Sequence, residues 1–371
     1  MAHYDIRSLT ASFATISLLG CSGGMGSDAD MVFKDRAAFS PPSYVCYKAP
    51  ASITIDGKIT PEEWNDIPWT EYFGDIRGEK GKKPYLKSMA KMAYDDNGMY
   101  IAVLMEEPHV WATITEHDTE IYMDNAVEFF IDPTNDTHDY VEYEINALGT
   151  DWDLYLSSPY RDDPVVISDW ECSGMRSAIH IDGTLNNPND KDKSWSMELF
   201  MPWKSIYQLA RGKDRPVDGD QVRVNLMRVE WPITIENGKY RKAPHDGEDE
   251  INESFWTWAP MGEANIHIPE YWGYVQFTDM VAGKGKVEFI NRPEEATKWV
   301  LRNLYYRQGE IHDAKGRFSS SATELKASEL ADESQLKSLE IHVTPSLYEM
   351  SLLAPDGNRW AIRQDGKVYM K

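Results

Sequence analysis

Hydrophobic and polar residues alternate along short segments between about Ala51 and Asp279. Residues 127–132 (VEFFID) and 141–146 (VEYEIN) each place apolar side chains on one face of an extended strand and polar side chains on the other. The tetrapeptide DDNG at residues 95–98 predicts a β-hairpin. Further strands are expected at residues 53–55, 87–94, 99–105, 195–201, 221–231, 255–258 and 271–277. Many short strands and few helical patterns favour an antiparallel β-sandwich.

The pattern changes after about Lys284. Pro293 suits the first turn of a helix, apolar residues then recur on one helical face, and Gly309 is the expected end. Four short strands are expected beyond it, at residues 339–343, 348–353, 360–363 and 368–370. We therefore predict an all-β, jelly-roll-like sandwich at residues 45–283 and a small C-terminal helix-plus-sheet extension at residues 284–371.

The first residues have the features of an export signal. Residues 9–20 are mildly apolar and too short to span a bilayer. The ending LLGC at residues 18–21 resembles a bacterial lipobox, in which the cysteine, here Cys21, carries lipid. We interpret residues 1–21 as a lipoprotein signal peptide and 22–44 as a flexible tether, which predicts lipid anchoring in a bacterial cell envelope, at the outer membrane. A poorly ordered N-terminus with an incidental cysteine is the alternative.

Composition narrows the choice of partners. The 371 residues include 38 Lys or Arg and 61 Asp or Glu, for a net charge of −23. Such a charge argues against nucleic acid or an anionic membrane surface as the main partner. Cys46 and Cys172 either pair in an oxidising compartment or remain two free buried thiols. The sequence contains no GxSxG motif of a serine hydrolase and no HExxH motif of a zinc protease. It also contains neither a Walker A nor a Rossmann nucleotide-binding motif.

The aromatic content points to sugar recognition. The chain has 13 Trp and 20 Tyr residues. A sugar ring offers an apolar C–H face that stacks on an aromatic ring, and hydroxyl groups that donate to carboxylates. We expect Trp64, Trp195 and Trp203 in the core. The candidate ligand-binding residues are Tyr122, Glu128, Glu144, Asn146, Trp152, Trp231, Trp256 and His267.

Two strands carry the polar part of this candidate site. If residues 127–132 and 141–146 are neighbours, Glu128, Glu144 and Asn146 line one face of the sheet. A solvated outer face is the alternative. A glycoside hydrolase with Glu128 and Glu144 as its carboxylate pair is a second hypothesis, and a structural or interaction lipoprotein is a third. Asp132, Asn135, Asp136 and Asp139 form an oxygen-rich loop that is either a solvated turn or a structural calcium site.

Several motifs in order along the chain resemble the family 9 carbohydrate-binding modules. These are ITIDG (53–57) with Glu63-Trp64, YDDNGMYI (94–101), DNAVEFFID (124–132), Trp195-Ser-Met-Glu198 with Pro202-Trp203, Val224-Asn225, and Trp258 before Trp272-Gly273. The resemblance covers roughly residues 53–277. It is strongest to a subgroup of lipoproteins in polysaccharide-degrading Bacteroidetes, which carries NALGT (146–150) and HIPEYWG (267–273).

This resemblance implies a β-sandwich, often with structural calcium, that holds the end of a glycan between two Trp residues. The conserved Glu of the family falls on Glu128, its first Trp near Tyr122, its Arg at about Glu144, and its second Trp near His267. These departures favour a different sugar or a different ligand. We expect a non-catalytic protein that binds an oligo- or polysaccharide for its capture or breakdown and requires no cofactor.

Overall fold

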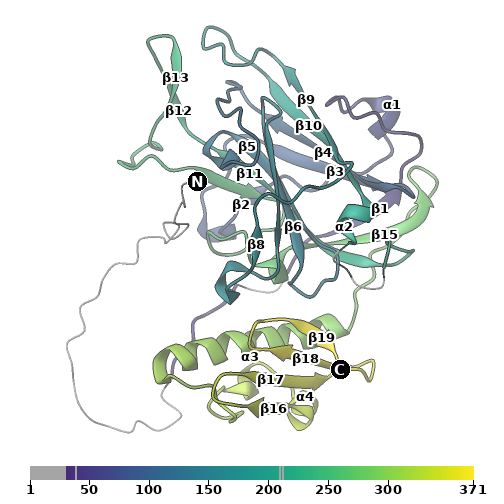
Figure 1. Ribbon diagram of the computed structural model, residues 1–371, viewed down its shortest axis with the longest axis vertical. Helices are drawn as coiled ribbons and strands as arrows, with labels where there is room; N and C mark the ends of the chain where they lie inside the picture. The colour runs from purple at the N-terminus through teal and green to yellow at the C-terminus, as the bar shows by residue number, and fades with distance from the viewer. Residues whose placement is uncertain (1–30, 38–39, 209, 211–212) are drawn as a thin grey trace.

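The computed structural model describes residues 31–37, 40–208, 210 and 213–371 (Figure 1). The expected signal peptide, with its candidate lipidation site Cys21, lies outside the described residues. Within the described part of the chain, no helix has the length and apolar character needed to cross a membrane.

Thirteen strands form one large sheet that bends over on itself. They are β1 (Ser43–Lys48), β2 (Gly74–Asp75), β3 (Ser88–Tyr94), β4 (Gly98–Glu106), β5 (Ala126–Asp132), β6 (Tyr140–Asn146), β7 (Asp151–Leu156), β8 (Val166–Ile167), β9 (Arg176–Asp182), β10 (Ser194–Pro202), β11 (Gln221–Glu230), β14 (Ser254–Thr257) and β15 (Gly273–Val281). The short helices of this region are α1 (Pro61–Trp64), η1 (Gly78–Lys80), η2 (Ile121–Met123), η3 (Tyr160–Asp162), α2 (Trp203–Ile206) and η4 (Pro269–Tyr271). A separate hairpin consists of β12 (Ile233–Glu236) and β13 (Lys239–Lys242).

The sheet folds over so that its two halves pack as a β-sandwich, which confirms the predicted architecture. The strand order is β8-β7-β6-β5-β11-β15-β1-β3-β4-β10-β9, with β14 and β2 attached beside β11. Phe129 of β5 and Met197 of β10 come from opposite halves of this order, yet both belong to one fully buried apolar cluster. The alternating apolar residues predicted from the sequence therefore face each other across the core.

One strand departs from the predicted antiparallel pattern. The first strand, β1, lies between β15 and β3 and runs parallel to both. Parallel neighbours need a long connection, and about forty residues, including α1, separate β1 from β3. The pairing joins distant segments, so local turn sequences carried no signal for it.

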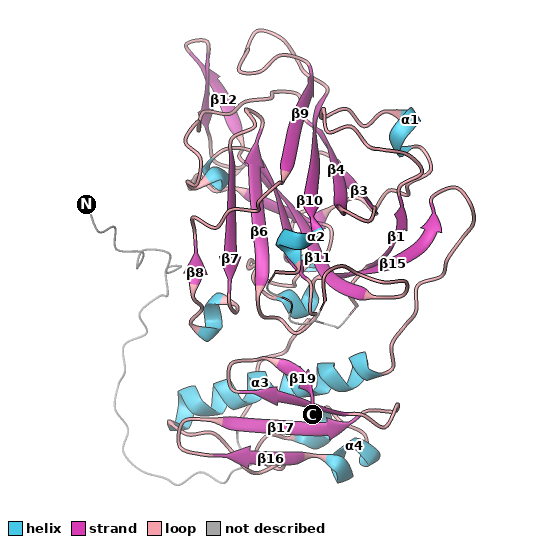
Figure 2. Cartoon of the chain, turned by 45° about the vertical axis from the view of Figure 1, so that its right-hand side comes forward, coloured by secondary structure: helices cyan, strands magenta, loops and turns pink. Residues whose placement is uncertain are grey.

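The C-terminal residues form a small unit of their own below the sandwich (Figure 2). Its elements are α3 (Glu294–Lys315), η5 (Ala327–Glu329), α4 (Glu333–Ser338), β16 (Glu340–Val343), β17 (Tyr348–Leu353), β18 (Arg359–Arg363) and β19 (Val368–Met370). The four strands form a sheet in sequence order, and α3 packs on β17 and β18. This arrangement is the predicted helix-plus-sheet extension.

The long helix α3 continues past its predicted end at Gly309. It ends instead at Lys315 and is capped by Gly316, which adopts a left-handed φ of 67°. Ile311 lies in this additional part of the helix and is fully buried in the C-terminal core. The burial of such a side chain outweighs the cost of about 1 kcal/mol that a mid-helix glycine carries.

The predicted core residues and the cysteines can be placed directly. Trp64, Trp195 and Trp203 are all buried, as expected. Cys46 and Cys172 are both buried and free, so of the two alternatives the structure shows unpaired thiols.

Candidate functional site

The two central strands β5 and β6 place three glutamates side by side. The alternating apolar residues of the two strands, 127, 129 and 131 in β5 and 141, 143 and 145 in β6, face the core of the sandwich. Glu128, Glu142 and Glu144 therefore point to the opposite face of the sheet. Glu128 lies directly across from Glu144 in the antiparallel register, and Phe130 lies across from Glu142. We call Glu128, Glu142 and Glu144 the carboxylate row.

The carboxylate row is not a solvated outer face. Glu128, Glu142 and Glu144 are only 2%, 5% and 3% exposed, and one oxygen of each lies within 4.8 Å of the others. Burial raises the pKa of Glu142 to about 8, although its hydrogen bond with Glu144 opposes the shift. Burial and the charges of neighbouring carboxylates raise the pKa of Glu128 and of Glu144 well above the usual range. Protons therefore remain on the row near neutral pH.

Within the described part of the chain, no basic side chain neutralises the row. Among the residues that the structure describes, none of the three glutamates forms an ion pair with a lysine or an arginine. Nε2 of His267 lies 3.9 Å from Oε2 of Glu142. Burial lowers the pKa of His267 to about 3, so its ring is neutral and does not form an ion pair. The backbone N–H of Tyr122 donates to Glu144 at 3.0 Å. The row thus retains unused capacity to bind polar groups of a ligand.

Aromatic side chains surround the carboxylate row. Trp152 of β7 lies across from Glu144 and is half-buried. Tyr122 is also half-buried, and the charges of Glu144 and Glu128 add to burial in raising its pKa. Tyr160 is 50% exposed and its ring stands edge-on to His267, with 4.5 Å between ring centroids. A sugar ring can stack on partly exposed aromatic rings while its hydroxyls hydrogen-bond to neighbouring carboxylates.

Five predicted ligand residues therefore gather at the row, namely Tyr122, Glu128, Glu144, Trp152 and His267. Glu142 and Tyr160 belong to this group as well but were not among the predicted site residues. The signal for Glu142 was present in the sequence, because it lies two residues before Glu144 and must share its face. Tyr160 lies on a loop after β7, where no periodic pattern indicates direction.

The other predicted ligand residues have different surroundings. Asn146 is fully buried and binds turn backbone, donating to Ile114 and accepting from Leu148 and Thr150. Trp231 supports the site from behind, because its indole N–H donates to the carbonyl of Tyr122 at 2.8 Å. Trp256 lies in the core between the sheets, so it does not face the row.

The oxygen-rich loop after β5 binds protein groups. Asp132 accepts from the backbone N–H groups of Thr134, Asn135 and Thr137. The side chain of Asn135 accepts from Arg223, and Lys367 forms ion pairs with Asp136 at 3.0 Å and with Asp139 at 3.4 Å. These contacts do not fit a calcium ion here, because donors of the protein already occupy the oxygens that calcium would need.

A cleft lies near the carboxylate row, beneath the β12–β13 hairpin. It has a volume of about 300 Å³, and Trp111, Tyr240 and Lys242 are among its lining residues. The buried indole nitrogen of Trp111 has no hydrogen-bond partner. The ammonium group of Lys242 stands 3.4 Å from the centroid of the Trp231 ring. We call this space the hairpin cleft, and it is a second place where a ligand can be sought.

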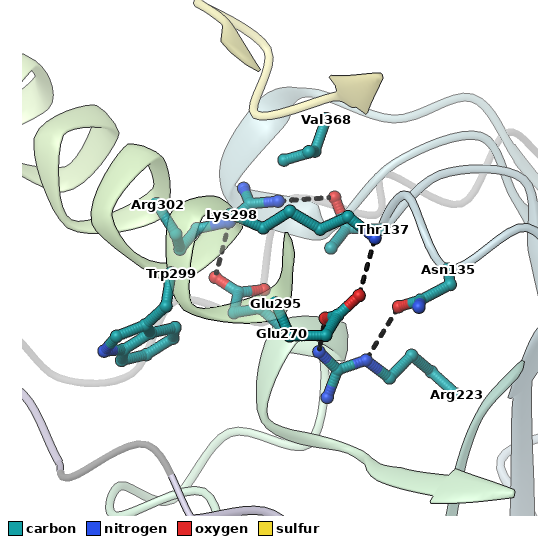
Figure 3. Close-up of a pocket in the computed structure, with 9 residues that line it drawn as sticks. All are labelled: Asn135, Thr137, Arg223, Glu270, Glu295, Lys298, Trp299, Arg302 and Val368. Atoms are coloured by element: carbon teal, nitrogen blue, oxygen red, sulfur yellow. Dashed lines mark hydrogen bonds and ion pairs between the residues drawn. The ribbon is translucent and has the colours of Figure 1, made fainter. Parts of the chain in front are cut away.

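The C-terminal unit holds the loops that carry Tyr160 and His267. Glu270, three residues after His267, accepts from Arg161 at 3.0 Å and from the hydroxyl of Tyr306 in α3. Arg302 of α3 lies 3.7 Å from the same carboxylate. Figure 3 shows Glu270 and Arg302 facing each other between α3 and the sandwich loops. The cavity there has a volume of only about 20 Å³, which is room for a water molecule and not for a sugar.

Comparison with known proteins supports the resemblance seen in the sequence. The family model described as carbohydrate family 9 binding domain-like matches residues 55–214. This region contains the carboxylate row together with Tyr122, Trp152 and Tyr160. No curated protein matches the sequence.

Three of the solved structures similar to this chain come from two organisms. A protein of Bacteroides uniformis assigned to carbohydrate binding is 18% identical with a TM-score of 0.47, and covers 64% of this chain and 100% of its own. A family 9 carbohydrate-binding module of Caldicellulosiruptor kristjanssonii in complex with cellotriose is 14% identical with a TM-score of 0.39, and covers 67% of this chain and 100% of its own. The same module in complex with glucose has a TM-score of 0.38 at 14% identity, with the same coverage. Over residues 55–214 the chain thus matches the family 9 carbohydrate-binding domains, and the resemblance is confirmed there.

Proposed function

We propose that the protein binds a neutral carbohydrate without cleaving it, beside the carboxylate row. The observation that carries this proposal is a set of three buried glutamates that have no basic partner in residues 31–37, 40–208, 210 and 213–371. They are bordered by the partly exposed rings of Tyr122, Trp152 and Tyr160. The match to the family 9 model over residues 55–214 supports it, because all six residues lie within that region.

The chemistry of the row selects the type of sugar. Sugar hydroxyls donate to carboxylates, and glutamates that retain their protons near neutral pH also donate to sugar oxygens. A sugar with its own carboxylate or sulfate would meet no lysine or arginine among the described residues at the row, and its charge would oppose ionisation of the glutamates beside it. We therefore expect neutral glycans to bind more tightly than uronate-containing ones.

Titration calorimetry with a panel of neutral and acidic oligosaccharides tests this proposal. Cello-oligosaccharides belong in the panel because a structurally similar module was solved with cellotriose. Trp152→Ala and Tyr160→Ala should each weaken binding about tenfold, equivalent to about 1.4 kcal/mol. Tyr72→Ala is the matched control, because Tyr72 is similarly exposed at 55% and lies away from the row.

Two results would contradict the proposal. One is the lack of binding to every glycan of the panel at millimolar concentration. The other is a loss of binding in Lys242→Met with no change in Trp152→Ala and Tyr160→Ala, which would place the sugar in the hairpin cleft.

A retaining glycoside hydrolase is the second candidate, and the pairing of Glu128 with Glu144 favours it. Their carboxylate oxygens lie within 4.8 Å of each other, and both have a raised pKa. Retaining enzymes place their two carboxyl groups about 5–5.5 Å apart. A hydrolase must release reducing sugar from a polysaccharide panel and lose that activity in Glu128→Gln. Sugar binding without turnover removes this candidate.

The proposal extends to the cellular setting. We infer that Cys21 carries a lipid anchor in a bacterial envelope and that binding serves polysaccharide capture or catabolism. The lipobox-like sequence and the polar tether after it support this inference. Cys21→Ser should move the protein from the detergent phase to the aqueous phase in a phase-separation experiment, while its sugar binding stays the same.

A further inference from the structure

A second group of titratable residues lies at β7, next to the edge of the sheet, on the face opposite Trp152. His117 comes from the loop between β4 and η2, Asp151 and Asp153 from β7, and Glu171 from the loop between β8 and β9. One ligand atom each of His117, Asp153 and Glu171 lies within 4.8 Å of the others. The three segments are far apart in the sequence, and they meet at these side chains.

The ring of His117 is oriented like that of a metal ligand. Its Nδ1 lies 2.9 Å from the backbone carbonyl oxygen of Asp151, which fixes the proton on Nδ1 when the ring is neutral. Its Nε2 then points its lone pair at acidic groups, with Glu171 at 3.2 Å and Asp118 at 3.3 Å. A metal-binding histidine is usually held in this way by a hydrogen bond from its other nitrogen.

Asp153 supplies an independent indication. Its side chain is fully buried, and one carboxylate oxygen, Oδ2, accepts from the backbone N–H of Cys172. The other oxygen, Oδ1, is buried and has no hydrogen-bond partner. A buried carboxylate oxygen without a donor is costly, and a bound cation would satisfy it.

We propose that His117, Asp153 and Glu171, assisted by Asp118, bind a divalent transition-metal ion, and that Zn²⁺ fits them. An imidazole with carboxylates is a ligand set that suits Zn²⁺, whereas Ca²⁺ and Mg²⁺ take oxygen ligands only. Zn–N and Zn–O bonds of about 2.0–2.2 Å in a tetrahedron place neighbouring ligand atoms about 3.3 Å apart. The distances from His117 Nε2 to Glu171 and Asp118, 3.2 and 3.3 Å, have this length.

A proton is the competitor for this space. Burial alone would lower the pKa of His117, but Glu171, Asp118 and Asp151 outweigh it and raise the pKa to about 9. A protonated His117 would bridge the same carboxylates without a metal, so a metal must displace that proton. The experiment therefore has to separate metal binding from a simple ion pair.

The bound metal would join the loop that contains Glu171 to β7 and to the loop before η2. The neighbouring residue Trp152 already donates from its indole N–H to Ser168 in that same loop. The metal site does not depend on sugar binding, and the two are measured separately.

Calorimetric titration of the chelator-treated full chain with ZnCl₂, in the absence of sugar, tests the proposal. We expect one equivalent of Zn²⁺ to bind, and His117→Gln and Glu171→Gln each to weaken binding at least tenfold. Both residues are exposed, so the variants should fold. Glu116→Gln is the matched control: it removes a charge from an exposed residue next to His117 and should change the affinity less than twofold.

Thermal unfolding gives a second measurement. Zn²⁺ should raise the unfolding temperature of the unmodified protein and of Glu116→Gln, and leave that of His117→Gln unchanged. The proposal is overturned if Zn²⁺ does not bind at millimolar concentration. It is equally overturned if all four proteins bind Zn²⁺ with the same affinity, which would indicate non-specific binding to an acidic surface.

Discussion

Two buried glutamates a short distance apart have opposite electrostatic behaviour. Glu142 in the carboxylate row and Glu270 at the C-terminal unit are each 5% exposed. Burial raises the pKa of Glu142 to about 8. Burial acts in the same direction on Glu270, but Arg161 and Arg302 outweigh it and lower its pKa to about 2. The difference lies in the basic partners, because the degree of burial is the same.

The comparison separates a structural carboxylate from a candidate binding carboxylate. Glu270 is ionised and held by Arg161, Arg302 and Tyr306, so it fastens α3 to the sandwich. Among the described residues, Glu142 has other carboxylates, a neutral histidine and the phenols of Tyr140 and Tyr160 nearby, and no basic group. Groups with such perturbed pKa values are concentrated at functional sites. Three experiments test whether this distinction holds.

The largest effect is expected when Glu270 loses a basic partner. Arg302 is buried, so Arg302→Met leaves the carboxylate under-compensated and should lower the free energy of unfolding by about 3–5 kcal/mol. Urea denaturation measures it. Lys337→Met removes an exposed ion pair with Glu333 and should cost about 0.5 kcal/mol or less. Equal effects of the two variants would show that Glu270 does not depend on its buried partner.

At the carboxylate row, substitution of Glu142 should have a smaller effect on the free energy of unfolding, and it should stabilise the protein instead of destabilising it. Because the pKa of Glu142 is raised, the folded protein binds this proton more tightly than the unfolded chain, and the resulting stability is lost as the pH rises from about 4.5 to about 8. Glu142→Gln cannot ionise, so its advantage over the unmodified protein should grow from pH 5 to pH 8, to about 1–3 kcal/mol. Urea denaturation at the two pH values gives the difference.

Glu270→Gln provides the contrast for that measurement. The lowered pKa of Glu270 means that its ionised form contributes stability above about pH 4.5, which is lost only as the pH falls towards 2. This variant should therefore be less stable than the unmodified protein by a similar amount at pH 5 and pH 8. If Glu142→Gln also lowered the free energy of unfolding by the same amount at pH 5 and pH 8, Glu142 and Glu270 would not differ in their electrostatic behaviour.

The smallest effect concerns sugar binding at a distance. Tyr306→Phe removes the hydroxyl that donates to Glu270, and so loosens the loop that carries His267. Loss of one such hydrogen bond is worth about 0.5–1 kcal/mol, so sugar affinity should fall two- to fivefold. Titration calorimetry measures the change. Tyr369→Phe removes a similar phenol–carboxylate bond, to Glu349 in the same unit but away from the sandwich, and should have no effect. Unchanged affinity in Tyr306→Phe would show that α3 does not position the site.

Much of the fold followed from local pattern. Alternation in residues 127–132 and 141–146 was sufficient to assign the faces of β5 and β6, because side-chain direction in a strand has a period of two. The parallel pairing of β1 was not predicted, because it depends on contacts with strands far away in the sequence.

The candidate site was predictable only in part. The cross-strand neighbours Glu128 and Glu144 followed from pairing two adjacent strands. Tyr160 and the support of its loop by α3 could not be anticipated, because they bring together segments about 140 residues apart. The core position of Trp256 was missed for the same reason, since the register of β14 against β11 decides which face it takes.

The sequence by itself determined that this is an acidic, Trp-rich β-sandwich with three glutamates on one face of two strands, because local alternation encodes side-chain direction. It left open whether that face is exposed to solvent or buried by other parts of the chain. Only the tertiary structure decided that the glutamates are buried beside three aromatic rings and that none of them has a basic partner among the described residues. The physical reason is that burial and charge compensation come from residues distant in the chain, and these set the pKa of a carboxylate as strongly as its own strand does.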